Sequence, residues 1–147
     1  MQSPGRCEVV HRDPTIILDA AHNPHGARAI AETVATEFAF DDLTAIVAVL
    51  GEKDVLGILQ ELEPIAHQII ITTNSSPRAM SVADLEKIAV EVFGADRVFT
   101  EATLTSAIDR AVKDSVRPLS DDTLGILITG SVVTVGEARS IIRRKFS

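Results

Sequence analysis

The chain has 147 residues, a net charge of −7, 46% hydrophobic and 24% charged residues, and neither Trp nor Tyr. This length allows one domain with a hydrophobic core, whereas the acidic charge and sparse aromatics argue against partners such as nucleic acid or an anionic membrane. One cysteine excludes an internal disulfide, no Cys/His cluster has zinc spacing, no apolar run would span a bilayer and no signal peptide is evident, so we expect a cytoplasmic protein without a metal site.

The first expected elements are two short strands, at residues 7–11 and 15–18, with a turn at 12–14 between them. Their closeness predicts an antiparallel hairpin. A helix follows, because Asn23 is a good N-cap and Pro24 suits the first helical position. Apolar residues then recur at helical spacing on one face of this segment.

Apolar strands and amphipathic helices alternate through the rest of the chain. The strands are expected at 43–50, 68–73, 97–100 and 124–129, and the helices at 54–62, 81–92, 104–112 and 131–144. Residues 41–42 and 115–122 are interpreted as surface loops. This order predicts one α/β domain over residues 1–147, with a Rossmann-like, mostly parallel six-stranded sheet, an antiparallel N-terminal hairpin strand and about five helices on both faces.

Polar clusters follow several of the expected strands. They are Asp19 to Asn23, Gly51 to Asp54, Thr72 to Ala79, and Thr129 to Ser131. In an open α/β sheet, ligands bind beyond the carboxyl ends of the strands. The convergence of these clusters on that edge predicts a binding site there.

The segment "LDAAHNP" illustrates both possible interpretations. The start of the Pro24 helix can attract an anion, Asp19 can accept from ribose hydroxyls or an ammonium group, and His22 can donate to a carboxylate. Taken alone, the same residues are also explained by a helix start and a loop-capping acid. Ser131, after the sharp turn allowed by Gly130, is similarly either a ligand contact or a simple N-cap.

Four further positions carry the same ambiguity. Lys53 and Arg78 are anion ligands or solvated charges, Asp54 is a site residue or an N-cap, and Arg6 precedes the first strand after "SPG". The chain has neither G-x-G-x-x-G after its first strand nor a P-loop motif, so these two nucleotide-binding signatures are absent. Cys7 is interpreted as a small core residue of the first strand.

Taken together and in order, these motifs resemble one family. The matching segments are "SPGRCEVV", "PTIILDAAHNPHGARA", "GEKD", "SPRA" and "ITGSVVTVGEAR". They are similar to the carboxyl-terminal domain of folylpolyglutamate synthase/dihydrofolate synthase, in the ATP-dependent Mur ligase family. The resemblance covers nearly the whole chain.

The resemblance implies an amide ligation. ATP phosphorylates a carboxylate of dihydropteroate or a folate, and the amine of L-glutamate attacks the acyl phosphate. ATP, Mg²⁺ and the pterin substrate are then held mainly by an amino-terminal P-loop domain. By motif, Arg6 and Asp19 would contact ATP, while His22 and Ser131 would help to place glutamate.

Asn23, Lys53, Asp54 and Arg78 also match family motifs, without an assigned role. No P-loop domain is present in these 147 residues, so the chain alone is expected to hold no catalytic residue or metal and not to catalyse ligation. Two alternatives remain. One is another Mur-type amino-acid ligase, although Ala20 replaces the aromatic residue usual there. The other is a non-catalytic nucleotide-binding or interaction module.

Overall fold

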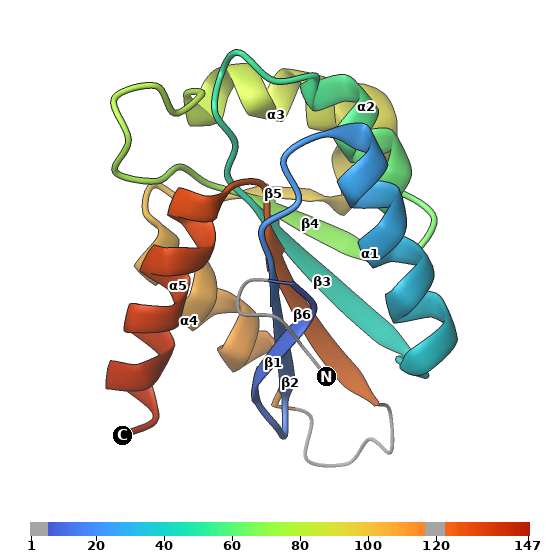
Figure 1. Ribbon diagram of the computed structural model, residues 1–147, viewed down its shortest axis with the longest axis vertical. Coiled ribbons are helices and arrows are strands. Elements are labelled where there is room, and N and C mark those ends of the chain that lie inside the picture. Colours follow the sequence, from blue (N-terminus) through green and yellow to red (C-terminus); the bar gives the residue numbers. More distant parts are fainter. Residues whose placement is uncertain (1–5, 117–122) are drawn as a thin grey trace.

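The structure, a computed structural model, describes residues 6–116 and 123–147 (Figure 1). Six strands and five α-helices are found there, in the predicted order. The strands are β1 (Glu8–His11), β2 (Thr15–Asp19), β3 (Asp42–Val47), β4 (Gln68–Ile71), β5 (Val98–Thr100) and β6 (Leu124–Thr129). The helices are α1 (Pro24–Glu37), α2 (Val55–Leu62), α3 (Val82–Phe93), α4 (Leu104–Asp114) and α5 (Val132–Lys145), with a short 3₁₀ turn, η1 (Ala95–Arg97).

The strands form one sheet in the order β1-β2-β6-β3-β4-β5. Only β1 is antiparallel to its neighbour, and the other pairs are parallel. The predicted fold class, including the antiparallel N-terminal hairpin, is therefore confirmed. The order also brings β2, from the start of the chain, beside β6, from its end, with Asp19 paired to Thr129.

Helices cover both faces of this sheet (Figure 1). Residues of α1, α2 and α3 pack on one face, and residues of α4 and α5 pack on the other. Successive strand residues contribute to opposite faces: Ile17 belongs to the first core, whereas Ile16 and Leu18 belong to the second. Such strands, buried on both sides, account for the continuous apolar runs in the sequence.

Several predicted boundaries are wrong at the strand ends. Strand β3 ends at Val47 and not at residue 50. Beyond Val47 the chain leaves the sheet, and Leu50 makes an isolated antiparallel bridge with Ala79. Asp42 opens β3 and is not a loop residue. Cys7 precedes β1, with a φ of 45°, so it is not part of that strand. The loop expected up to residue 122 lies partly outside the described residues.

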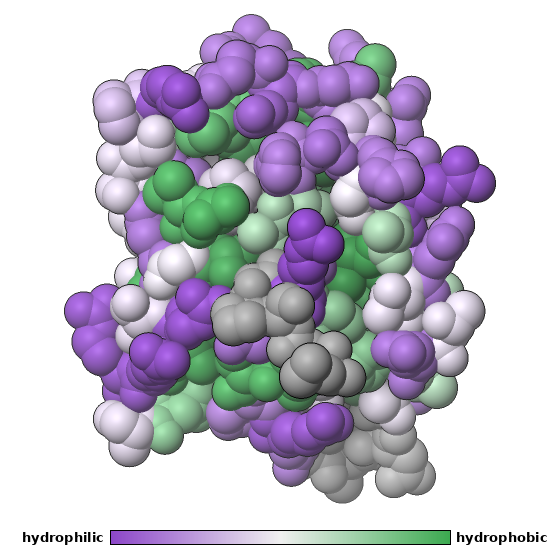
Figure 2. Space-filling view, viewed as in Figure 1, coloured by the Kyte–Doolittle hydropathy of each residue, from purple (hydrophilic) through white to green (hydrophobic). Residues whose placement is uncertain are grey.

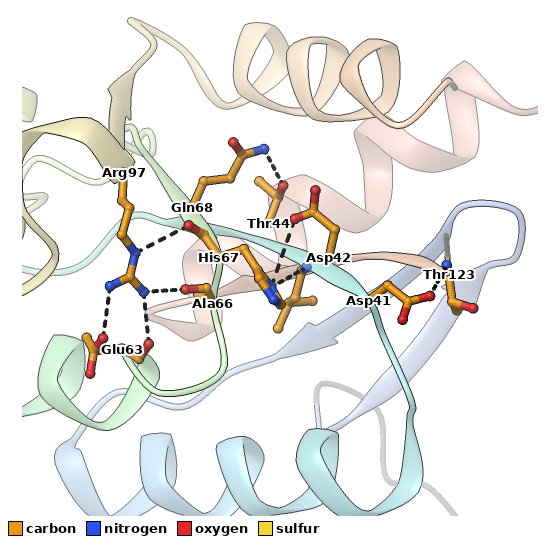
Figure 3. A network of polar contacts seen from close by, with 10 residues as sticks. Asp41, Asp42, Thr44, Glu63, Ala66, His67, Gln68, Arg97 and Thr123 are labelled. Carbon is orange, nitrogen blue, oxygen red and sulfur yellow. Dashed lines mark hydrogen bonds and ion pairs between the residues drawn. The ribbon is translucent and has the colours of Figure 1, made fainter. Parts of the chain in front are cut away.

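A cluster of polar contacts at the amino ends of the strands ties the segment between α2 and β4 to η1 (Figure 3). The Arg97 guanidinium donates to Glu63 Oε2 at 2.9 Å, to the carbonyl oxygens of Glu63 and Ala66 at 3.0 and 2.5 Å, and to that of His67 at 3.3 Å. It also lies 4.9 Å from the centre of the Phe93 ring. The Arg97 side chain in η1 therefore contacts both the segment between α2 and β4 and the end of α3, and its planar fork suits several acceptors at once.

Replacing Arg97 with alanine is expected to lower the free energy of unfolding by about 2 kcal/mol, because several acceptors lose a charged donor. Arg97→Lys should recover only part of the loss. Arg28→Ala is the control. The side chains of Arg28 and of its ion-pair partner Glu32 are each 68% exposed, so this ion pair should contribute less than about 0.5 kcal/mol to stability. Urea unfolding measures all three variants, and equal losses for Arg97→Ala and Arg28→Ala would contradict the prediction.

Candidate functional site

A cavity of about 560 Å³ lies at the carboxyl end of β2. Its walls come from the residues before β1, the segment that joins β2 to α1, one side of α1, and the first residue of α5. The lining residues are Arg6, Cys7, Asp19 to Asn23, His25, Gly26, Ala29, Ile30, Thr33 and Val132. Four of the predicted site residues, Arg6, Asp19, His22 and Asn23, are thus brought together.

The Asp19 carboxylate is held by the backbone on both sides. Its Oδ1 accepts from the Cys7 amide at 2.8 Å, and its Oδ2 accepts from the Ala21 amide at 3.0 Å. Burial raises the pKa of Asp19 above its ordinary value of 3.8, although these two hydrogen bonds and the Arg6 charge act in the opposite direction. Each oxygen keeps a lone pair, so a fixed, partly buried acceptor faces the cavity.

This raised pKa has a measurable consequence for stability. Between pH 3.8 and the folded-state pKa, the folded chain binds more protons at Asp19 than the unfolded chain does, so the free energy of unfolding falls as pH rises through that range. A carbon-13 NMR titration should give an Asp19 midpoint above 3.8. The pH dependence of unfolding should weaken in Asp19→Asn. A midpoint at or below the ordinary value would contradict the account.

The start of α1 is less open to anions than the sequence predicts. Pro24 has no amide hydrogen, and Asn23 Oδ1 accepts from the Gly26 amide at 2.8 Å. The His25 amide is therefore the first-turn donor left without a partner inside the helix. Asn23 is confirmed as the N-cap, and capping occupies the oxygen of its side chain.

His22 is exposed and lines the cavity. Its Nδ1 lies 3.1 Å from the carbonyl oxygen of Ala20. Because a carbonyl only accepts, Nδ1 carries the proton, and Nε2 of the neutral ring is left as an acceptor. When the ring is protonated, Nε2 becomes a donor to an anion. The Ala20 contact thus fixes the ring and leaves one nitrogen for a ligand.

Ser131 is near the cavity but does not line it. Its side chain is buried, with 2% of the residue exposed, and its Oγ accepts from the Thr134 amide at 3.0 Å as the N-cap of α5. The next residue, Val132, is 69% exposed and forms part of the cavity wall. The N-cap interpretation is therefore confirmed, and Val132 is the residue at this helix start that reaches the cavity.

The remaining predicted residues lie at the ends of β3 and β4, outside the lining of this cavity. Asp54 caps α2 by accepting from the Gly57 amide at 3.0 Å. Arg78 forms an exposed ion pair with Glu52, at 3.2 Å, and its carbonyl accepts from the Gly51 amide. Lys53 belongs to the same turn. The loops after β3 and β4 are therefore joined by an ion pair and a backbone hydrogen bond. The Arg78 charge is already paired with Glu52.

Two residues of this edge were not predicted as site residues from the sequence. Cys7 lines the cavity, where burial, then the Asp19 and Glu37 carboxylates, raise the pKa of its thiol, so it stays protonated at neutral pH. Asn74 is buried after β4 and reaches the start of α5. The signal in the sequence that could have identified Asn74 is a polar residue shortly after a buried strand.

The surface around the site is mixed in character. Figure 2 shows hydrophilic residues at the periphery of this face and smaller hydrophobic areas between them. Among residues 6–116 and 123–147, no helix combines the length and apolar character needed to cross a bilayer. The same residues contain no group of three His, Cys, Asp or Glu side chains arranged to hold a metal ion.

Comparison with known proteins identifies relatives of this domain. The family model for the Mur ligase, glutamate ligase domain, matches residues 5–132. A dihydrofolate synthase/folylpolyglutamate synthase of Mycobacterium tuberculosis is 48% identical over 150 residues, which cover 97% of this chain and 31% of the relative. The chain thus spans roughly a third of the length of that relative.

Solved structures agree with this assignment. Mycobacterium tuberculosis folylpolyglutamate synthase, complexed with ADP and AMPPCP, gives a TM-score of 0.90 at 49% identity, over 95% of this chain and 32% of that one. A bifunctional folylpolyglutamate synthase/dihydrofolate synthase with Mn, AMPPNP and L-glutamate bound gives 0.81 at 27% identity, over 97% and 32%. The chain therefore belongs to the Mur ligase family, as a glutamate ligase domain of the folylpolyglutamate synthase/dihydrofolate synthase type.

Proposed function

We propose that this chain acts as the carboxyl-terminal domain of an ATP-dependent ligase that adds L-glutamate to dihydropteroate or a folate. The observation that carries the proposal is that Arg6, Asp19 and His22 line one cavity, beside the start of α5. A positive charge, a fixed carboxylate and an imidazole in one cavity suit a ligand that carries phosphates, hydroxyls and a carboxylate. The names of the relatives point to the same chemistry.

The nucleotide is assigned to the side of the cavity with Arg6 and Asp19. The Arg6 guanidinium would pair with phosphate oxygens, for which its fork of donors is well suited. Asp19 accepts from two amides yet keeps free lone pairs, so it would accept from the ribose hydroxyls. Because its carboxylate is already fixed, little side-chain entropy would be lost on binding.

Glutamate is assigned to the side with His22 and the start of α5. Protonated His22 would donate from Nε2 to a glutamate carboxylate, while Nδ1 remains on Ala20. Ser131 and the positive end of α5 would favour the same negative group. These contacts orient the amine for attack, and holding two reactants in line is a large part of catalysis in such ligations.

ATP and Mg²⁺ are proposed to bind mainly outside this chain. The described residues contain no three His, Cys, Asp or Glu side chains grouped to hold a metal ion, so we assign the Mg²⁺ ligands to a part of the enzyme outside this chain. A second, ATP-holding domain would supply those ligands, and this domain would close over the nucleotide. We therefore expect the isolated chain to bind ATP weakly and not to ligate.

The proposal is tested in a chimeric ligase, in which this chain replaces the matching region of the Mycobacterium tuberculosis relative. The expected result is ADP release that requires both L-glutamate and dihydropteroate or a folate. A panel of other amino acids distinguishes another Mur-type ligase, which would prefer one of them. No glutamate-dependent ADP release from a folded chimera that binds ATP would overturn the proposal.

The isolated chain provides a second comparison. Weak nucleotide binding, measured by calorimetry, agrees with a domain that supplies only part of a site. Tight binding that needs no magnesium would instead favour the alternative of an independent nucleotide-binding module.

A further inference from the structure

Strand β1 is joined to α5 near both of its ends. At the cavity end, the Arg139 guanidinium donates to Glu8 Oε1 at 2.6 Å, and the two side chains of this ion pair are only 24% and 25% exposed. At the other end, the His11 ring stacks on the ring of Phe146, which follows α5, with 3.7 Å between the ring centres. The helix that begins at the cavity therefore also holds the first strand of the sheet (Figure 1).

The Glu8 end of β1 leads directly into the cavity wall. Arg6 and Cys7, the two residues before this strand, both line the cavity. Cys7 has a φ of 45°, a conformation that residues with a side chain rarely adopt and that persists only where neighbouring contacts hold the backbone. One such contact is the hydrogen bond from the Cys7 amide to Asp19 Oδ1. The other is the ion pair that Arg139 makes with the next residue, Glu8.

One face of α5 contributes to the cavity and holds β1. Val132 and Arg139 lie seven residues apart in this helix, so they share a face and are separated by about 10 Å along the axis. Val132 lines the cavity opposite the segment that contains Arg6, and two turns later Arg139 contacts Glu8. Arg6 itself is exposed, so its place at the cavity depends mainly on the backbone that follows it. The ion pair anchors that backbone to α5.

We propose that Arg139 is a positioning residue for nucleotide binding, acting through Glu8 on Arg6. By holding β1, it keeps the Arg6 guanidinium at the cavity, on the side assigned to the phosphates. Strand β1 needs this support because it is an edge strand with one neighbour, and its register with β2 shifts between Val9 and His11. The inference rests on the proposed function and adds to it a residue that does not itself touch the nucleotide.

Arg139→Met in the chimeric ligase removes the ion pair and keeps most of the apolar length of the side chain. We expect the KM for ATP to rise about 5-fold, which is less than the rise of about 10-fold or more expected when Arg6 itself is replaced by alanine. The KM for glutamate should stay within about twofold. Arg139→Lys can still pair with Glu8 through its ammonium group, so it should limit the rise to about 2–3-fold.

The decisive comparison repeats these changes in a chimera that already carries Arg6→Ala. If Arg139 acts through Arg6, Arg139→Met should raise the KM for ATP no further once the Arg6 guanidinium is gone, because two residues of one chain of contacts are not additive. Loosening that reaches the nucleotide by another route would raise the KM by the same factor in both backgrounds. If Arg139→Met folds too poorly to assay, Arg139→Lys gives the same comparison.

Two controls separate positioning from general loosening. Phe146→Leu weakens the contact of the same two elements at the end of β1 that lies away from the cavity. Arg110→Met removes a comparable ion pair, with Glu101 at 3.0 Å and side chains 34% and 25% exposed, which ties α4 to the end of the opposite edge strand, β5. Both should lower the midpoint of thermal unfolding yet leave the KM for ATP unchanged. All rates are compared at a temperature where thermal unfolding shows each chimera folded.

The possible outcomes are distinct. An unchanged KM for ATP in Arg139→Met and Arg139→Lys overturns this inference and leaves the proposed function standing. An equal rise in Arg110→Met, or an undiminished effect of Arg139→Met beside Arg6→Ala, would assign Arg139 a structural role only, and also overturn it. If Arg6→Ala alone leaves the KM for ATP unchanged, the nucleotide role of Arg6 in the proposed function fails, and this inference fails with it.

Discussion

Gly130→Ala is expected to lower the free energy of unfolding by about 3 kcal/mol or more, which combines a strained backbone with an overpacked side chain. Gly130 joins β6 to α5 with a φ of +126°, a region that residues with a side chain rarely adopt. A Cβ there would also lie 2.9 Å from the carbonyl carbon of Ala48 and closer still to its oxygen. The sharp turn after β6 therefore requires glycine.

Two other glycines serve as controls in the same urea unfolding experiment. Gly94 has a φ of +84° and a ψ of 150°, with nothing within 4 Å of an added Cβ, so Gly94→Ala should cost about 2 kcal/mol from backbone strain alone. Gly136 lies inside α5 with open space around it, and Gly136→Ala should stabilise by about 0.5–1 kcal/mol. A loss at Gly130 no larger than that at Gly94 would contradict the contact with Ala48.

Asp19→Ala is expected to reduce glutamate-dependent ADP release by the chimeric ligase at least about 10-fold, because a charged acceptor to the nucleotide is lost. The same change leaves the amides of Cys7 and Ala21 without their acceptor and should cost about 2 kcal/mol of stability. The rate is therefore compared at a temperature where thermal unfolding shows both proteins folded, and the KM for ATP is expected to rise.

Asp41→Ala is the matched control for this variant. Asp41 also accepts from a backbone amide, that of Thr123 at 2.8 Å, but it lies at the start of β3, at the opposite end of the sheet (Figure 3). Its replacement should cost stability without changing the KM for ATP. Unchanged turnover in Asp19→Ala would remove the assigned nucleotide role.

Most of the fold could be predicted because its signals are local. Continuous apolar runs identified the buried strands, and Asn23, Asp54 and Ser131 each cap the helix at whose start the sequence places them. Each of these signals acts over a few residues. The order of strands in the sheet has no local signal, since it depends on packing between distant segments.

The site could be predicted only in part for the same reason. Asp19 ends β2, and His22 and Asn23 follow in the next few residues, so their proximity to one another follows from the sequence. That Arg6 joins them depends on the hairpin, and that α5 begins beside them depends on the pairing of β2 with β6. The Glu52 partner of Arg78 and the reach of Asn74 to Thr134 appear only in three dimensions.

The most direct measurement is a crystal structure of the chimeric ligase with AMPPNP and L-glutamate. We predict nucleotide oxygens within hydrogen-bonding distance of Arg6 and Asp19, and a glutamate carboxylate near His22 and the start of α5. A bound nucleotide and glutamate that both leave the cavity of this domain without contact would contradict the central claim.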